Sequence, residues 1–341
     1  MIQIEEAVIR KLILHRVTNE EDKAIISEDL FDYSNEDEEN TLKKVFLKPF
    51  VSYSQTFEFN HEIDLSYNVL FSLSKNIYEG NDFVEQSGNI AQHLISSSKH
   101  HNIKDGDLFV VKFDDIKLNN KYYEGLGIYK FEDKDSFIET TISNKKIDFS
   151  FRKGIGNKKP DKACFILFTE EPYTILIIDS NTNETDYWQN DFINHKSKND
   201  NVNSTNNFLT LTKNFITQQI PTDFEVTKAD QIDFLNRSVD YFKTHENFDK
   251  QEFEKEVFGD KNVIKSFQQF DETYRQENEV ELADNFEISA QAVKKQARVF
   301  KSVLKLDRNF HIYIHGNREL IEQGVDEKGR KFYKIYYEEE N

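Results

Sequence analysis

Residues 108–113 read LFVVKF and residues 122–131 read YYEGLGIYKF, and both runs are rich in β-branched and aromatic residues. They follow a turn signal, Lys-Asp-Gly-Asp, at residues 104–107. Four more runs of this kind lie at residues 137–142, 147–151, 163–168 and 173–178. Short β-rich runs at this spacing predict an antiparallel meander in the middle of the chain.

The residues before the meander carry a different pattern. Apolar residues cluster and alternate at 7–17 and 24–26, and the polar residues 18–22 separate them, which predicts a strand pair with a polar turn. Helical spacing of apolar residues follows at 38–51, 65–79 and 82–101. We therefore expect an N-terminal domain, residues 1–193, that mixes helices with an antiparallel sheet.

Residues 194–207 are rich in Asn, Lys, Ser and Asp and nearly free of apolar residues, which predicts a linker. Beyond it, apolar spacing predicts helices at 208–220, 231–243, 251–257, 263–274 and 290–306. The apolar period then changes to two at 310–314, and a turn at 326–329 precedes a strand at 332–337. The expected fold class is α+β, with a helical domain at 208–341 that ends in a small β-meander.

Composition indicates a folded, acidic protein. Hydrophobic residues make up 37% of the 341 residues, and aromatic residues make up 13%. The one cysteine, Cys164, lies in an apolar run, so it is expected to be buried, and its isolation fits a reducing compartment. The first residues carry acids rather than the basic residues of a secretory signal, and no apolar run approaches the roughly 18 residues that span a bilayer. We expect a cytoplasmic protein with no membrane partner.

The net charge of −18 repels a polyanion, so binding to nucleic acid requires a local basic patch. Such a patch lies between residues 289 and 310. An apolar stripe recurs there at spacings of four, three and four, and a basic stripe repeats the same spacing one residue later. The apolar stripe comprises Val293, Ala297, Phe300 and Leu304, and the basic stripe comprises Lys294, Arg298, Lys301 and Lys305.

Lys295 and Arg308 widen the basic patch, and Asp307 is its only acid, so six cations minus one acid give a local charge of +5. The stripe therefore predicts a helix that docks through one face and presents cations on the next. The alternative is a solvated helix face that interacts with acids elsewhere in the chain. Residues 282–293 resemble a helix-turn-helix in which Ser289 caps the second helix, although Glu287 stands where the turn prefers Gly.

Two further groups of residues suggest binding sites. Arg152, Lys153, Lys158 and Lys159 surround two glycines and are expected to form a loop, which is either solvated or makes secondary phosphate contacts. His311, Tyr313 and His315 share one face of a predicted strand. Four residues along a strand span roughly 13 Å, which is too far for both imidazoles to bind one ion, so we expect packing or base stacking there and no metal.

The best candidate for catalysis is a pair of acidic positions in the meander. Asp115 lies near the end of one predicted strand, and Glu132, Asp133 and Lys134 follow the next, in an order that loosely echoes metal-dependent nucleases. With 62 acidic residues in the chain, such spacing arises easily by chance. No Ser-His-Asp or Cys-His arrangement stands out, so we expect a protein that is not an enzyme and needs no cofactor.

Residues 288–315 as a whole, from Ile288-Ser289-Ala290 through Tyr313-Ile314-His315, resemble the signature of bacterial nucleoid-associated proteins of the YejK/NdpA-like family, in its Bacteroidetes-type form. Residues 127–131, 187–192 and 230–239 are similar to that family too. The resemblance implies association with the nucleoid and DNA binding without a known catalytic centre, and it supplies no map of binding residues.

Together, the basic patch and the resemblance predict a DNA-binding protein that contacts mainly phosphates, with little base readout, through Lys294, Lys295, Arg298, Lys301, Lys305 and Arg308. The main alternative is an acidic adaptor that binds another nucleoid or DNA-processing protein. A Mg²⁺-dependent nuclease is the third hypothesis. The sequence also leaves a homo-oligomer open.

Overall fold

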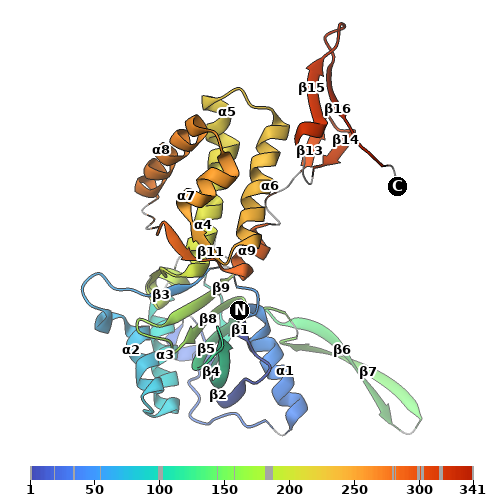
Figure 1. The fold of residues 1–341 in the computed structure, drawn as a ribbon. Helices are drawn as coiled ribbons and strands as arrows, with labels where there is room; N and C mark the ends of the chain where they lie inside the picture. Colours follow the sequence, from blue (N-terminus) through green and yellow to red (C-terminus); the bar gives the residue numbers. More distant parts are fainter. Residues whose placement is uncertain are drawn as a thin grey trace. The chain divides into compact units, whose positions relative to one another are not determined.

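A computed structural model describes residues 2–18, 20–33, 35–53, 55–98, 103–143, 145–156, 158–180, 187–278, 280, 282–297, 300, 303–314 and 318–339. The chain divides into two compact units, Met1–Lys198 and Asn199–Asn341. The predicted α+β class is confirmed: unit 1 is built on an antiparallel sheet, and unit 2 is mainly helical with short hairpins (Figure 1). No helix among these residues is long and apolar enough to cross a lipid bilayer.

The main sheet of unit 1 is antiparallel and has the order β1-β4-β5-β8-β9-β3-β10, with β2 pairing beside β1 on the same edge of β4. Its central strands are β4 (Gly106–Leu118), β5 (Lys121–Phe131), β8 (Lys162–Leu167) and β9 (Thr174–Asp179). The outer strands are β1 (Ile2–Gln3), β2 (Val8–Val17), β3 (Phe57–Phe59) and β10 (His195–Ser197). The predicted meander therefore supplies the centre of the sheet.

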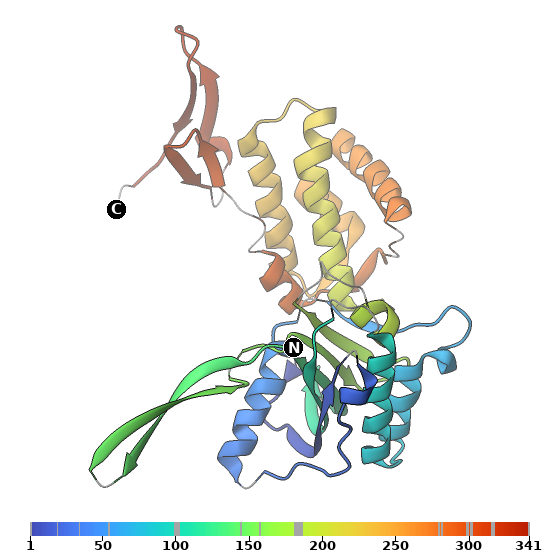
Figure 2. The same cartoon turned by 180° about the vertical axis from the view of Figure 1, so that it is seen from behind.

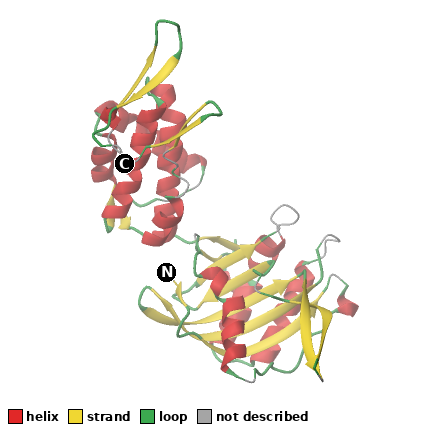
Figure 3. Ribbon diagram, turned by 90° about the vertical axis from the view of Figure 1, so that its right-hand side faces the viewer, coloured by secondary structure: helices red, strands yellow, loops and turns green. Residues whose placement is uncertain are grey.

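Helices cover both faces of this sheet (Figure 3). The helix α1 (Glu36–Phe46) lies on one face, followed by the 3₁₀ turn Lys48–Phe50. On the other face lie α2 (Val69–Tyr78), α3 (Phe83–Ser97) and a π-helix, η4 (Tyr187–Ile193). Further 3₁₀ turns occupy Glu21–Lys23 and Leu65–Tyr67. The three helices of the predicted helical block are thus confirmed, each within a few residues of the expected ends.

Alternation along the strands divides the core between the two faces. In β5, Leu126 and Ile128 point to the side of α2 and α3, whereas Tyr129 and Phe131 point to the side of α1. Gly127 lies between Leu126 and Ile128, and a Cβ atom on it would clash with the ring and hydroxyl of Tyr129. The glycine therefore leaves the space in which the Tyr129 ring packs.

Two of the predicted β-rich runs leave the main sheet. They form β6 (Asp135–Ser143) and β7 (Lys146–Gly154), a hairpin that pairs only with itself. It is inserted between β5 and β8, so the strands on either side of it still pair with each other. Cys164 in β8 is fully buried, as predicted, and burial raises the pKa of its thiol.

Unit 2 begins with a continuous helical stretch, α4 (Asn201–Asn214), the π-helix η5 (Phe215–Gln219) and α5 (Ile220–Asp223). It continues with α6 (Lys228–Thr244), α7 (Lys250–Phe253), the π-helix η6 (Glu254–Phe258) and α8 (Lys261–Glu277), and ends its helical part with α9 (Ala290–Gln296). A short pair of strands, β11 (Asn247–Asp249) and β12 (Asn285–Glu287), links the regions before α7 and α9.

Phenylalanine dominates the helical core of unit 2. Phe208 of α4 is fully buried and contacts the rings of Phe242, Phe248 and Phe253, with the Phe248 centroid 4.2 Å away. Phe267 of α8 lies 4.9 Å from Phe258. Aromatic side chains from four helices thus pack together and hold α4 and α6 against each other.

Two small hairpins end the chain in place of one continuous meander. They are β13 (Val303–Leu306) with β14 (Phe310–Tyr313), and β15 (Ile321–Val325) with β16 (Lys331–Ile335), joined by the 3₁₀ turn Arg318–Leu320. Leu304, Ile314 and Ile321 pack on Ala229 and Ile232 of α6. A hydrogen bond from Asn236 to the carbonyl of Ile314 (3.0 Å) and an ion pair between Arg318 and Asp230 (2.5 Å) hold them there.

Two sequence predictions need correction. The predicted strand pair within residues 1–30 is wrong, because β2 pairs with β4 and the returning segment keeps a single bridge, Arg16 to Ile25. The division between the two units falls within the Asn-rich segment 194–207, but this segment is not an irregular linker, since it contains β10 and the first half of α4. Asp200 caps α4 by accepting from the backbone N–H groups of Val202 and Asn203, which starts a helix in a segment that has almost no apolar residues.

Candidate nucleic-acid interface

The basic patch begins on α9, which starts as the sequence predicts. Ser289 is the N-cap, and its hydroxyl accepts from the backbone N–H of Ala292. Its own N–H donates to the Thr205 hydroxyl of α4 at 3.0 Å, which fixes the start of α9 against α4. The helix-turn-helix prediction is wrong, however, because the residues before Ser289 form strand β12, paired with β11, where a first helix was expected.

The predicted helix over residues 290–306 is also wrong in its extent. The helix ends at Gln296 and is capped by Ala297, whereas residues 303–306 form strand β13. Leu304 pairs across the hairpin with Ile312, and Leu306 pairs with Phe310. The sequence pattern of 290–306 favours a helix because Leu304 continues the apolar spacing of Val293, Ala297 and Phe300, whereas Leu304 and Leu306 share one face of the strand that pairs with β14.

The apolar stripe is buried although it does not lie on one helix. Val293 and Phe300 join the phenylalanine core, and Ala297 packs against it. Leu304 belongs instead to the cluster on α6 that holds the C-terminal hairpins. The prediction of burial is therefore confirmed for Val293, Phe300 and Leu304, whereas Ala297 is partly buried.

The structure describes four of the six predicted cations, and all four are exposed. Lys294 and Lys295 lie in the last turn of α9, Lys305 lies in β13, and Arg308 lies in the turn between β13 and β14. None of them forms an ion pair with any residue in the described ranges. The other two predicted cations, Arg298 and Lys301, lie outside the described residues.

The β13–β14 hairpin has an outer face that combines cations with aromatic rings. Leu304 and Ile312 point toward α6, so Lys305 and its cross-strand neighbour His311 share the opposite face. Tyr313 lies two residues further along this face, and its side chain is 65% exposed. His315, which was predicted to share the face, lies outside the described residues. Aromatic rings beside cations form the kind of surface on which nucleic acids bind.

The helix α6 separates the two groups of cations. Leu304 of β13 packs near Ile232 of α6. Val293 of α9 lines the pocket beside Lys243, which follows Ile232 by eleven residues in the same helix. At 1.5 Å per residue the two positions are roughly 16 Å apart along the helix axis. This spacing corresponds to about five base pairs of duplex. A single basic helix stripe is therefore replaced by two cationic groups, one near each end of α6.

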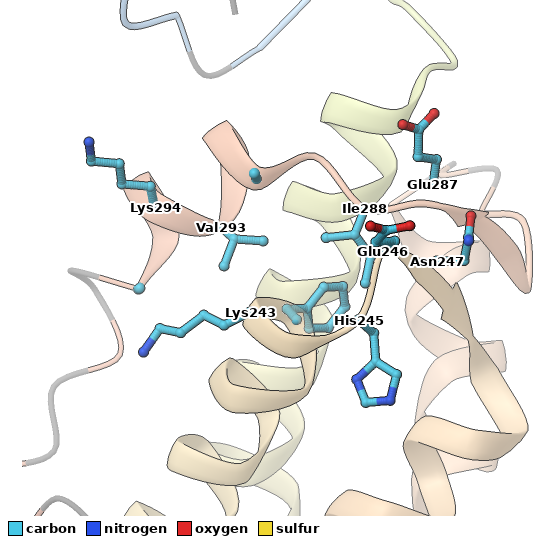
Figure 4. A pocket seen from close by; sticks show the side chains of 11 residues that line it. Lys243, His245, Glu246, Asn247, Glu287, Ile288, Val293 and Lys294 are labelled. Carbon is cyan, nitrogen blue, oxygen red and sulfur yellow. The ribbon is translucent and has the colours of Figure 1, made fainter.

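A pocket of about 820 Å³ adjoins the α9 group (Figure 4). The ammonium groups of Lys243 and Lys294 lie at one end of it, whereas Glu246 and Glu287 lie at the other end. Lys243 also pairs with the exposed Asp240 at 3.5 Å. The pocket thus has a cationic end that extends the surface formed by Lys294 and Lys295.

The secondary basic cluster in unit 1 is partly neutralised. Arg152 and Lys153 lie in β7, so the expected loop begins only after Gly154. Arg152 pairs with Glu139 at 2.9 Å and Lys158 pairs with Asp161 at 3.5 Å, whereas Lys153 and Lys159 are exposed. These cations offer less free charge to phosphate than the four in unit 2.

One group of described residues has the donor set of a metal site. His245, Glu252 and Glu256 bring three ligand atoms within 4.8 Å of one another. Burial raises the pKa of Tyr241 to about 12, so its hydroxyl stays protonated and donates to Glu252 at 3.1 Å. In a tetrahedral zinc site the ligand atoms lie about 3.3 Å apart, and the two carboxylates are exposed to water. The group therefore does not form a closed metal centre.

The structure separates the residues of the nuclease hypothesis. Asp115 lies at a bulge of β4, opposite Glu124 of β5. Because Glu132 follows Glu124 by eight residues along the strand direction, Asp115 and Glu132 lie roughly 26 Å apart along the sheet. The Glu132 carboxylate is buried and pairs with Lys130 at 2.9 Å, and Lys134 pairs with Asp107. The two acids cannot hold one Mg²⁺ between them, so this constellation is not a catalytic centre.

Fold and site together define an acidic α+β protein whose helical unit presents exposed cations and aromatic rings. The family model of nucleoid-associated protein YejK matches residues 13–337, and the chain belongs to that family. A comparison with curated proteins found no match. The family membership confirms the resemblance seen in the sequence and establishes a nucleoid-associated class for the chain.

Proposed function

We propose that the protein binds DNA directly in the bacterial nucleoid, within the cytoplasm, and acts without catalysing a reaction. The observation that carries the proposal is the set of four exposed cations, Lys294, Lys295, Lys305 and Arg308, which have no acidic partner among the described residues. In a chain of net charge −18, cations that stay unpaired are available to a partner of strong negative charge.

The chemistry of these groups favours phosphate contacts over base recognition. Three of the four cations are exposed lysines and the fourth, Arg308, lies in a turn, so their long side chains can reach the phosphate backbone of DNA without a fixed geometry. The exposed ring of Tyr313 beside Lys305 adds a stacking surface that tolerates any sequence. Arg298 and Lys301 belong to the same segment of sequence and are included in the proposed surface.

A salt titration of binding by purified protein tests this function. We expect affinity for a short duplex to fall steeply between about 50 and 200 mM salt, because each neutralised phosphate releases counterions. Four contacts correspond to a slope of about −3.6 in log affinity against log salt. Parallel measurement on single-stranded DNA establishes which form is preferred. Absence of binding to both at low salt would contradict the proposal and favour an acidic adaptor for nucleoid or DNA-processing proteins.

A further inference from the structure

The β6–β7 hairpin is exposed along its length. All residues of β6 are exposed, and in β7 only Gly154 is partly buried. Figures 1 and 2 show that it extends away from the sheet of unit 1. With nine residues in each strand, it is roughly 30 Å long. An isolated hairpin is at best marginally stable in water, so a further contact would stabilise it.

One face of the hairpin is apolar. Ile138 pairs with Phe151 and Ile142 pairs with Ile147, and Phe149 stands between these pairs on the same face. Their exposed fractions lie between 59% and 79%. The rings of Phe149 and Phe151 meet edge to face at 5.9 Å. We call this surface of five side chains the arm face.

The opposite face is mostly polar. Glu139 and Arg152 form an ion pair at 2.9 Å, and Ser143 lies opposite Lys146. Phe137 is the large apolar side chain on this face. The hairpin is therefore amphipathic: its polar face suits water, whereas its apolar face suits contact with another apolar surface.

We propose that the arm face docks on the arm face of a second copy of this chain, so that two hairpins pack face to face in a symmetric dimer. A two-fold contact brings the same patch of both subunits together, and it requires a patch that matches itself. The arm face meets this condition because its apolar residues run along both strands on either side of its middle, at Thr140 and Phe149. Two sheets packed in this way lie about 10 Å apart.

The area of the arm face suits a dimer of this kind. Five large apolar side chains that are mostly exposed would each bury on the order of 100 Å², or about 500 Å² per hairpin. The two hairpins then bury about 1,000 Å² in total, which is the minimum expected of a biological interface. In a monomer the apolar side chains of the arm face remain exposed to water, and monomeric proteins usually avoid an exposed apolar patch of this size.

The charges favour this partner over DNA. Residues 135–154 carry four cations and three acids, a net charge of +1, so the rest of the chain carries −18 − 1 = −19. Two copies repel each other through their acidic surfaces and repel least where the hairpins meet. One excess positive charge, with Lys153 as the cation on the side of β7 that carries Phe149 and Phe151, gives little affinity for phosphates.

Sedimentation equilibrium of the full chain tests the proposal. We expect the wild type to form dimers in the range of about 1 to 100 µM. Phe149→Glu with Phe151→Glu should raise the dissociation constant of the dimer at least about 100-fold, because each subunit loses two apolar anchors and gains repelling charges. The matched control is Phe137→Glu with Ser143→Glu, which adds the same charge to the opposite face beside Arg152 and Lys146, and it should leave the dimer intact.

A cross-link gives a second test that does not depend on how the hairpin tolerates glutamate. Thr140→Cys places a thiol near the proposed two-fold axis, and mild oxidation should give a covalent dimer, because Cys164 is buried and unreactive. Thr141→Cys, one residue away on the opposite face, should stay monomeric under the same treatment. A wild type that is monomeric at every concentration, or a dimer that survives both glutamates on the arm face, would overturn the proposal. So would equal cross-linking of the two cysteine variants. Protection of the hairpin from hydrogen exchange that appears only when DNA is added would show that the arm face binds DNA, and it would overturn the proposed dimer contact.

Discussion

His15 shows how burial sets the chemistry of a single side chain. It is 1% exposed in β2, its Nδ1 accepts from the backbone N–H of Ser27 at 3.1 Å, and its Nε2 lies 3.3 Å from the Ser87 hydroxyl. Burial lowers its pKa from 6.5 to about 4, because no acid compensates for the lost hydration of the charged ring. The pKa of His195 falls to about 4 for the same reason.

These two histidines predict an acid-labile unit 1. Between about pH 6.5 and pH 4 the unfolded chain binds protons that the folded chain does not, so the free energy of unfolding falls as the pH falls through this window. Each group accounts for a loss on the order of 3 kcal/mol. We expect urea unfolding curves to show this loss, and His15→Gln should show a smaller loss between about pH 7 and pH 4.5. Equal losses in the variant and the wild type would contradict the assignment.

Glu132 marks the limit of what the sequence can say about one residue. Its spacing from Asp115 fits a metal-binding pair, and nothing in the sequence indicates that Lys130 reaches it. The side chain of Lys130 is buried, and burial lowers its pKa, while its ammonium group donates to Glu132 and to the carbonyl of Lys104. The carboxylate thus compensates a buried cation, which only the tertiary structure reveals.

At the scale of elements, long helices and strands were predictable from the apolar pattern, whereas short ones were not. The helices α1, α3 and α6 and the strands β4, β5 and β8 follow from local spacing, because each is long enough to fix its period. β13 is four residues long, and α4 begins in a polar segment whose cap, Asp200, supplies the start signal. Pairing of β2 with β4, about a hundred residues apart, leaves no local signal at all.

The same limits apply to the candidate site. The sequence predicts the cap at Ser289, the burial of the apolar stripe and the exposure of Lys294 and Lys305. The sequence does not predict that the cations lie in two places, on α9 and on a hairpin, because this division depends on the pairing of residues 303–306 with β14. The outer face with Lys305, His311 and Tyr313 follows from this pairing, and its alternation was visible in part from the strand period.

The hairpin β13–β14 should depend on its contact with α6. Leu304 is 4% exposed and packs on Ala229 and Ile232, so Leu304→Ala should destabilise unit 2 by about 2–4 kcal/mol. Because the hairpin lies at the edge of the unit, we expect hydrogen exchange to increase first in residues 303–313. Val325→Ala, which truncates a side chain that is 62% exposed in β15, is the control and should change neither quantity. Uniform exchange throughout unit 2 would show that the hairpin is not separately anchored.

At the scale of the whole molecule, the acidic composition and the proposed function are compatible because charge is unevenly distributed. A net charge of −18 limits nonspecific contact with other polyanions, while the segment 289–310 carries a local charge of +5. The proposed dimer would carry two such segments.

The most direct test of DNA binding through unit 2 compares two variants of equal charge. The first changes Lys294, Lys295, Lys305 and Arg308 to Gln, and the control changes the exposed Lys44, Lys48, Lys121 and Lys328 to Gln. Measurement of affinity for a duplex across a salt series should give a slope about 3.6 shallower in the first variant than in the wild type, and a nearly unchanged slope in the control. Equal slopes for the two variants, both folded, would contradict the account.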